Sequence, residues 1–118
     1  MVFEDALTAV ALHEDWSVRG HAMVIWKAHV ENISQLTEDQ ARDFASVYRR
    51  TEGILLDLTG ADRAIMLKLG IITPHLHVHI YPVSKGLDRQ AVMDIIDGRV
   101  REPRDGGFAR VVRLSFRA

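Results

Sequence analysis

One stretch of the chain alternates strictly between histidine and aliphatic residues: Pro74-His75-Leu76-His77-Val78-His79-Ile80-Tyr81-Pro82. Successive side chains of a β-strand point to opposite faces, so the three histidines and Tyr81 share one face and the aliphatic residues share the other. This pattern predicts a half-buried strand over 76–81, with a proline at each end where a strand tolerates one. The histidine face is then free to line a cleft.

The segments around this strand predict an α+β fold. Short apolar runs favour further strands over 6–12, 21–26, 64–69 and 108–116. Thr37 and Gln40 form a capping-box pattern before a helical repeat over 38–58 that ends near Gly60, and a short amphipathic helix is expected over 88–97. The order β-β-α-β-β-α-β predicts a mostly antiparallel sheet of about five strands with one long and one short helix.

Composition indicates one globular domain spanning residues 1–118. The chain has 118 residues, of which 47% are hydrophobic and 26% are charged, and its net charge is −1. Cysteine is absent, which excludes disulfides and a thiolate nucleophile. We find no signal-peptide pattern and no apolar run long enough to span a bilayer. We therefore expect a cytoplasmic protein without a nucleic-acid or membrane partner.

The histidine row supports two chemical interpretations. Residues two apart on a strand are separated by roughly 7 Å, so two of the rings could share a metal ion with a further ligand, but three on a straight strand could not. In the other interpretation, neutral imidazoles act in a row on an anionic substrate. An imidazole can attack phosphorus directly while its second nitrogen is held by a hydrogen bond. His77 has a neighbour on each side and is the best-placed nucleophile.

The row resembles the signature of the histidine-triad (HIT) family, in which histidine and apolar residues alternate and a proline often follows. A second segment, over 20–32, is similar to the family's upstream strand and turn, which begin with Gly-His and end after Lys-x-His. The resemblance covers about residues 6–84; the helix and strand expected over 88–116 match only generically. It implies a HIT-like domain, usually a homodimer, that hydrolyses or transfers nucleotides at the α-phosphate. Nucleoside phosphoramidates, dinucleoside polyphosphates and adenylylated molecules would be substrates, with no metal or cofactor.

The resemblance also implies residue roles. His77 corresponds to the nucleophile, His79 to the contact with the phosphate and leaving group, and His75 to a residue that orients the nucleophile. The other candidates are the upstream catalytic histidine His21, the phosphate contacts Thr73 and Lys68, and the nucleoside contacts His13 and Trp16.

Two departures from the family pattern leave alternatives open. His13 occupies the position of an acidic ribose-binding residue, and the loop before the triad carries the aliphatic pair Ile71-Ile72 where polar side chains are usual. A nucleotide-binding module without catalysis therefore remains an alternative. The spacing of the histidines also leaves open a metal-dependent hydrolase that uses two of the triad histidines.

Overall fold

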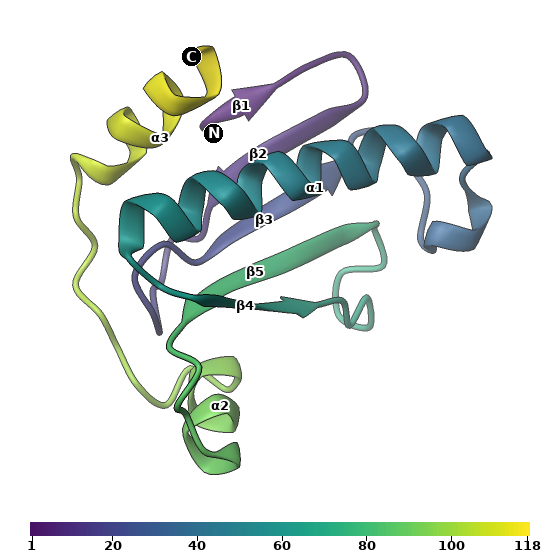
Figure 1. The fold of residues 1–118 in the computed structure, drawn as a ribbon. Helices are drawn as coiled ribbons and strands as arrows, with labels where there is room; N and C mark the ends of the chain where they lie inside the picture. Colours follow the sequence, from purple (N-terminus) through teal and green to yellow (C-terminus); the bar gives the residue numbers. More distant parts are fainter.

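The computed structural model describes all 118 residues. The chain forms an antiparallel sheet with its main helix on one face (Figure 1). The strands are β1 (Phe3–Glu4), β2 (Thr8–Leu12), β3 (Ala22–Trp26), β4 (Arg63–Leu67) and β5 (His77–Val83), in the spatial order β1-β2-β3-β5-β4. A 3-10 turn, η1 (Ile33–Gln35), leads into α1 (Glu38–Thr59), and α2 (Arg89–Ile96) and α3 (Phe108–Arg117) follow β5. The predicted α+β class is confirmed.

The capping signals of α1 act as the sequence predicts. The Thr37 hydroxyl accepts a hydrogen bond from the Gln40 backbone N–H, and the Gln40 side chain accepts one from the Thr37 N–H. These bonds satisfy backbone donors that the first helical turn leaves free. The helix ends at Gly60, whose φ of 73° suits a residue without a Cβ. Its buried residues Phe44 and Leu55 cover the aliphatic face of the sheet.

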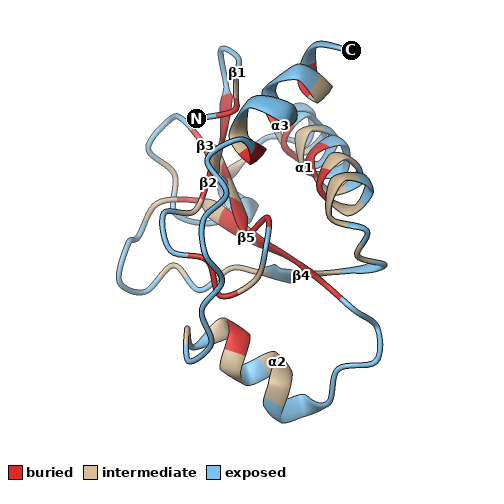
Figure 2. Ribbon diagram, turned by 90° about the vertical axis from the view of Figure 1, so that its left-hand side faces the viewer, coloured by how far each residue is buried: buried red, intermediate tan, exposed pale blue.

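The predicted strand over 108–116 is wrong, because this segment forms α3. Phe108, Val112 and Phe116 recur every four residues and are all buried, and this spacing fits one face of a helix. The exposed Val111 and Leu114 interrupt that pattern and produce the local alternation that suggested a strand. α3 lies on the same side of the sheet as α1 (Figure 2).

The fifth strand of the sheet is instead β1, which pairs with β2 through Phe3 and Glu4. Two residues are too few for a recognisable period. A second correction concerns Pro82, which lies inside β5 and pairs with Ala64 of β4. β3 pairs with β5 only as far as Ile80, so the missing N–H of Pro82 lies where the sheet has no partner on that side.

β5 lies between β3 and β4, so its histidine face is flanked by a strand on each side. Leu76, Val78 and Ile80 are completely buried against the helical layer, as the alternation predicts. The opposite face is left to His77, His79 and Tyr81. α2 reaches one end of this face, where Ile95 packs on Tyr81 and Val83. No helix in the molecule is both long and apolar enough to cross a bilayer.

Candidate functional site: a histidine cluster between two pockets

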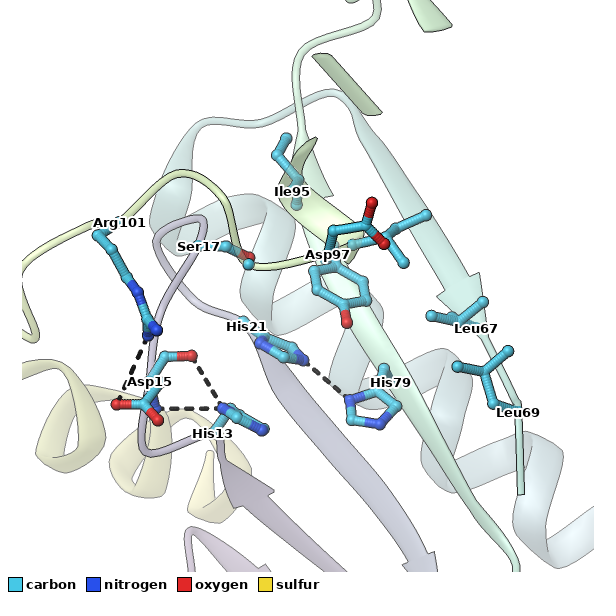
Figure 3. Close-up of a pocket in the computed structure, with 13 residues that line it drawn as sticks. His13, Asp15, Ser17, His21, Leu67, Leu69, His79, Ile95, Asp97 and Arg101 are labelled. Carbon is cyan, nitrogen blue, oxygen red and sulfur yellow. Dashed lines mark hydrogen bonds and ion pairs between the residues drawn. The ribbon is translucent and has the colours of Figure 1, made fainter. Parts of the chain in front are cut away.

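The histidine face of β5 borders two adjoining pockets. The first, of about 330 Å³, lies towards α2 and is called here the tyrosine-side pocket. Its lining includes His13, Asp15, Ser17, His21, Leu67, Leu69, His79, Tyr81, Ile95, Ile96, Asp97, Gly98 and Arg101 (Figure 3). The second, of about 500 Å³, is called the isoleucine-side pocket and is lined by His13, Met23, Leu69, Gly70, Ile71, Ile72, Thr73, His77 and His79. His13, Leu69 and His79 line both.

His77 is held in one tautomer by its own strand. Its Nδ1–H donates to the backbone carbonyl oxygen of His75 at 2.7 Å. A carbonyl can only accept, so the ring proton lies on Nδ1 and the lone pair lies on Nε2. His77 lines the isoleucine-side pocket. The ring therefore presents a lone pair on Nε2 at the position that the sequence predicts for the nucleophile, and that role stays a prediction.

His79 is coupled to His21. Nδ1 of His79 lies 2.9 Å from Nε2 of His21, so one proton is shared between them (Figure 3). His21 is stacked between two other rings: its centroid is 4.0 Å from that of Tyr81 and 4.4 Å from that of His13. His13 itself lies with Nδ1 2.8 Å from the Asp15 carbonyl oxygen. Stacking and hydrogen bonds thus fix the orientation of the imidazole rings of His13, His21 and His79.

Both coupled histidines are held neutral by their surroundings. Desolvation, followed by the nearby His13 and His79, lowers the pKa of His21 to about 3, although the Asp15 carbonyl acts in the opposite direction. Desolvation, followed by His77 and His13, lowers the pKa of His79 to about 4. A phosphoryl anion placed beside these rings would favour their protonated forms again. The site is therefore suited to take up negative charge and a proton together.

The other predicted residues divide into those within the pockets and those outside. Thr73 lines the isoleucine-side pocket with His77, and His13 lines both pockets. His75 lines neither: its Nε2–H donates to the Trp26 carbonyl oxygen at 2.5 Å, and it acts on His77 through its own carbonyl.

Two of the expected substrate contacts do not line either pocket. Lys68 lies outside both, and its ammonium group donates to Asn32 Oδ1 at 3.4 Å. Trp16 is only 2% exposed and packs edge-on against Phe108 in the core, so its ring has no free face for a base. We therefore leave Trp16 out of the site.

Sequence reasoning missed several residues of the tyrosine-side pocket. Tyr81 could have been found, because it lies two positions after His79 on the same strand face. Asp97 and Arg101 could not, since α2 and the segment after it reach the pocket only through tertiary contacts. Glu102 N–H donates to the Trp16 carbonyl oxygen at 2.8 Å, and Arg101 lies 3.8 Å from Asp15. These contacts fasten the segment beside the site.

The metal alternative has no support in this geometry. No group of three or more histidine, aspartate or glutamate side chains lies close enough together to hold a metal ion. The histidine nitrogens that meet, on His21 and His79, bind one another.

Solved structures share the fold. A hypothetical histidine triad nucleotide-binding protein from Sulfolobus tokodaii is 25% identical, with a TM-score of 0.74 over 98% of this chain and 82% of that one. Histidine triad proteins from Sinorhizobium meliloti and Bradyrhizobium japonicum are 19% and 20% identical, with TM-scores of 0.81 and 0.79; each comparison covers 97% of this chain and 87% of the other.

No protein with a curated description matches the sequence. The family model described as HIT domain matches residues 1–86, which include β1 to β5 and the pocket histidines His13, His21, His77 and His79. This match covers well over half of the chain. The chain therefore belongs to the HIT domain family.

Proposed function

We propose that the protein binds a nucleotide and cleaves a bond at its α-phosphorus through a covalent nucleotidyl-His77 intermediate, as a hydrolase or transferase. Membership of the HIT family supports nucleotide binding and hydrolase or transferase chemistry at the level of the superfamily. The observation that carries the finer proposal is the 2.7 Å bond from His77 Nδ1 to the His75 carbonyl oxygen. That bond leaves Nε2 as a nucleophile inside a pocket.

In the first step, His77 Nε2 forms a bond to the α-phosphorus and the bond to the leaving group breaks. His79 borders both pockets and is the nearest ring for the phosphoryl oxygens and the leaving group. With the shared proton on His21 Nε2, His79 presents its Nε2–H for this contact. The bound anion raises the pKa of His79 from its lowered value, so that a proton can pass to the departing group.

In the second step, water or another acceptor attacks the phosphorus and gives its proton to His79, while the bond from phosphorus to His77 Nε2 breaks. With water, the products are a nucleoside monophosphate and the free enzyme. In this proposal the nucleoside lies in the tyrosine-side pocket, where Asp15 and Asp97 offer carboxylates to sugar hydroxyls beside the apolar Ile96.

The decisive experiment is detection of the intermediate. The protein is mixed with an adenosine phosphoramidate, quenched without acid and digested, and the triad peptide is examined by mass spectrometry for an added nucleoside monophosphate. His77→Ala should lose both the adduct and turnover. His29→Ala removes an exposed histidine that lines neither pocket and should retain both. More than a few per cent of wild-type activity in His77→Ala would exclude His77 as the nucleophile.

A nucleotide-binding module without catalysis is the second candidate, and one observation favours it. No lysine or arginine lines the isoleucine-side pocket, so charge stabilisation at the phosphorus falls to the histidines and Thr73. Nucleotide binding detected by calorimetry, without an adduct or turnover, would select this candidate.

We also propose that the protein acts as a homodimer, as the family resemblance implies. β4 pairs with β5 on one side only, so its other edge has free backbone groups that a second copy could pair with. Light scattering after size-exclusion chromatography tests this: a mass of one chain would reject it.

A further inference from the structure

The wall beside the proposed nucleophile exposes large apolar side chains. Leu69, Ile71 and Ile72 are 64%, 83% and 97% exposed, and all three line the isoleucine-side pocket with His77. Exposing consecutive isoleucines to water gains nothing for folding, because their hydrocarbon remains hydrated. Exposed apolar groups gathered at a pocket are instead typical of a binding surface. Met23 on β3 adds to the same lining.

The charges around the site also support a surface that binds apolar groups. The isoleucine-side pocket has no lysine or arginine in its lining. Lys68, the neighbouring cation, lines neither pocket and is bonded to Asn32. In the tyrosine-side pocket the one guanidinium, Arg101, is offset by Asp15 and Asp97. A chain of phosphates brings several negative charges and needs cationic partners to replace its lost hydration.

We infer that the group attached to the α-phosphorus of the substrate is an uncharged, apolar amine or alcohol, which lies against the Leu69–Thr73 segment, and not a polyphosphate chain. This inference rests on the proposed function, and it selects one substrate class for that site. For an amine, the bond from His77 Nε2 to phosphorus forms as the P–N bond breaks. The nitrogen leaves with its electron pair and takes a proton from His79. Water then attacks the phosphorus and passes a proton back to His79, the bond from phosphorus to His77 Nε2 breaks, and a nucleoside monophosphate is released.

A series of adenosine 5′-phosphoramidates tests the inference. The amines are straight-chain alkylamines from methyl to hexyl, which have nearly equal basicity, so intrinsic reactivity at the phosphorus stays the same. We expect kcat/KM to rise about two- to fourfold for each methylene that the pocket covers. A hexylamine analogue that ends in a carboxylate should lose this gain. Diadenosine triphosphate should be the poorest substrate in the set.

Variants assign the effect to the loop. The double substitution Ile71→Ser with Ile72→Ser should flatten the dependence on chain length while the methyl compound is still hydrolysed. Leu114→Ser is the matched control, because Leu114 is 52% exposed on α3 but lines neither pocket. It should keep the wild-type dependence.

The outcomes separate the two proposals. Formation of the His77 adduct with no dependence on chain length, or preference for diadenosine triphosphate, would overturn the apolar subsite and leave the proposed function standing. Absence of an adduct with every compound would overturn the proposed function, and the inference with it.

Discussion

Lowering the pH from 7 to 5 should destabilise the protein, because the fold keeps His21 and His79 neutral. Their pKa values in the folded state are about 3 and about 4, against an ordinary value of 6.5. Between these limits the unfolded chain binds protons that the folded protein does not, so stability is greatest above pH 6.5 and falls as the pH drops towards the folded values. Each pKa unit corresponds to about 1.4 kcal/mol.

The size of this loss of stability follows from the difference between pH 5 and the ordinary histidine pKa of 6.5, which applies to the unfolded chain. His21, which is 4% exposed, should account for a loss of about 2 kcal/mol. His79 is only partly buried, so water reduces its share, and the total lies between about 2 and about 4 kcal/mol. Asp5 and Asp105 have pKa values below the ordinary 3.8 and titrate outside this range of pH.

Urea titrations at several pH values measure this loss, with fluorescence of the buried Trp16 and Trp26 as the signal. His21→Phe keeps a ring between His13 and Tyr81 but removes one titrating group, so it should lose about half of the pH dependence or more. His29→Gln, in an exposed turn, is the control for loss of an imidazole outside the site. A wild-type change below about 0.5 kcal/mol would refute the neutral, desolvated state of these rings. An unchanged slope in His21→Phe would move the effect to another group.

Two further pairs of substitutions test the helices. Gly60→Ala should destabilise the protein by about 1 kcal/mol, because a residue with a Cβ is strained at positive φ even where the Cβ meets no neighbour. Gly53→Ala, inside α1 with open space around it, should stabilise the protein by about 0.5–1 kcal/mol. Chemical denaturation measures both changes, and equal effects would contradict the assignment of Gly60 as the cap of α1. Val112→Ala should cost about 2 kcal/mol, because Val112 is completely buried on the inner face of α3. Val111→Ala, at a side chain 45% exposed on the same helix, should change stability by less than about 0.5 kcal/mol. The reverse order would mean that α3 presents its other face to the core.

Local sequence patterns predicted the structure correctly where the residues that form the pattern also make the contacts that the pattern predicts. The alternation over 75–81 predicted which side of β5 is buried, because the two faces of a strand are separated by geometry alone. Thr37, Gln40 and Gly60 predicted the ends of α1, because their hydrogen bonds and backbone angles involve only near neighbours. The hydrogen bond of His77 to the carbonyl of His75 is local in the same sense.

Local patterns failed where burial depended on a distant partner. Residues 108–116 contain apolar side chains on several faces, and only contact with the core selects Phe108, Val112 and Phe116 as the inner face of a helix. Trp16 illustrates the same limit. An aromatic side chain near a predicted pocket can stack on a ligand or pack in the core. Trp16 packs in the core because it contacts Phe108, which is distant in sequence.

The sequence by itself therefore determined the histidine row on one strand face, the HIT resemblance and the main helix, since each depends on spacing within a few residues. Only the tertiary structure joined His21 to His79 and brought Asp97 and Arg101 into the pocket that His13 lines. These contacts span 58 or more residues along the chain, and their distances depend on how the sheet and α2 pack. The pKa values of the histidines follow from that packing, because desolvation, the largest cause of both shifts, does not exist until the chain is folded.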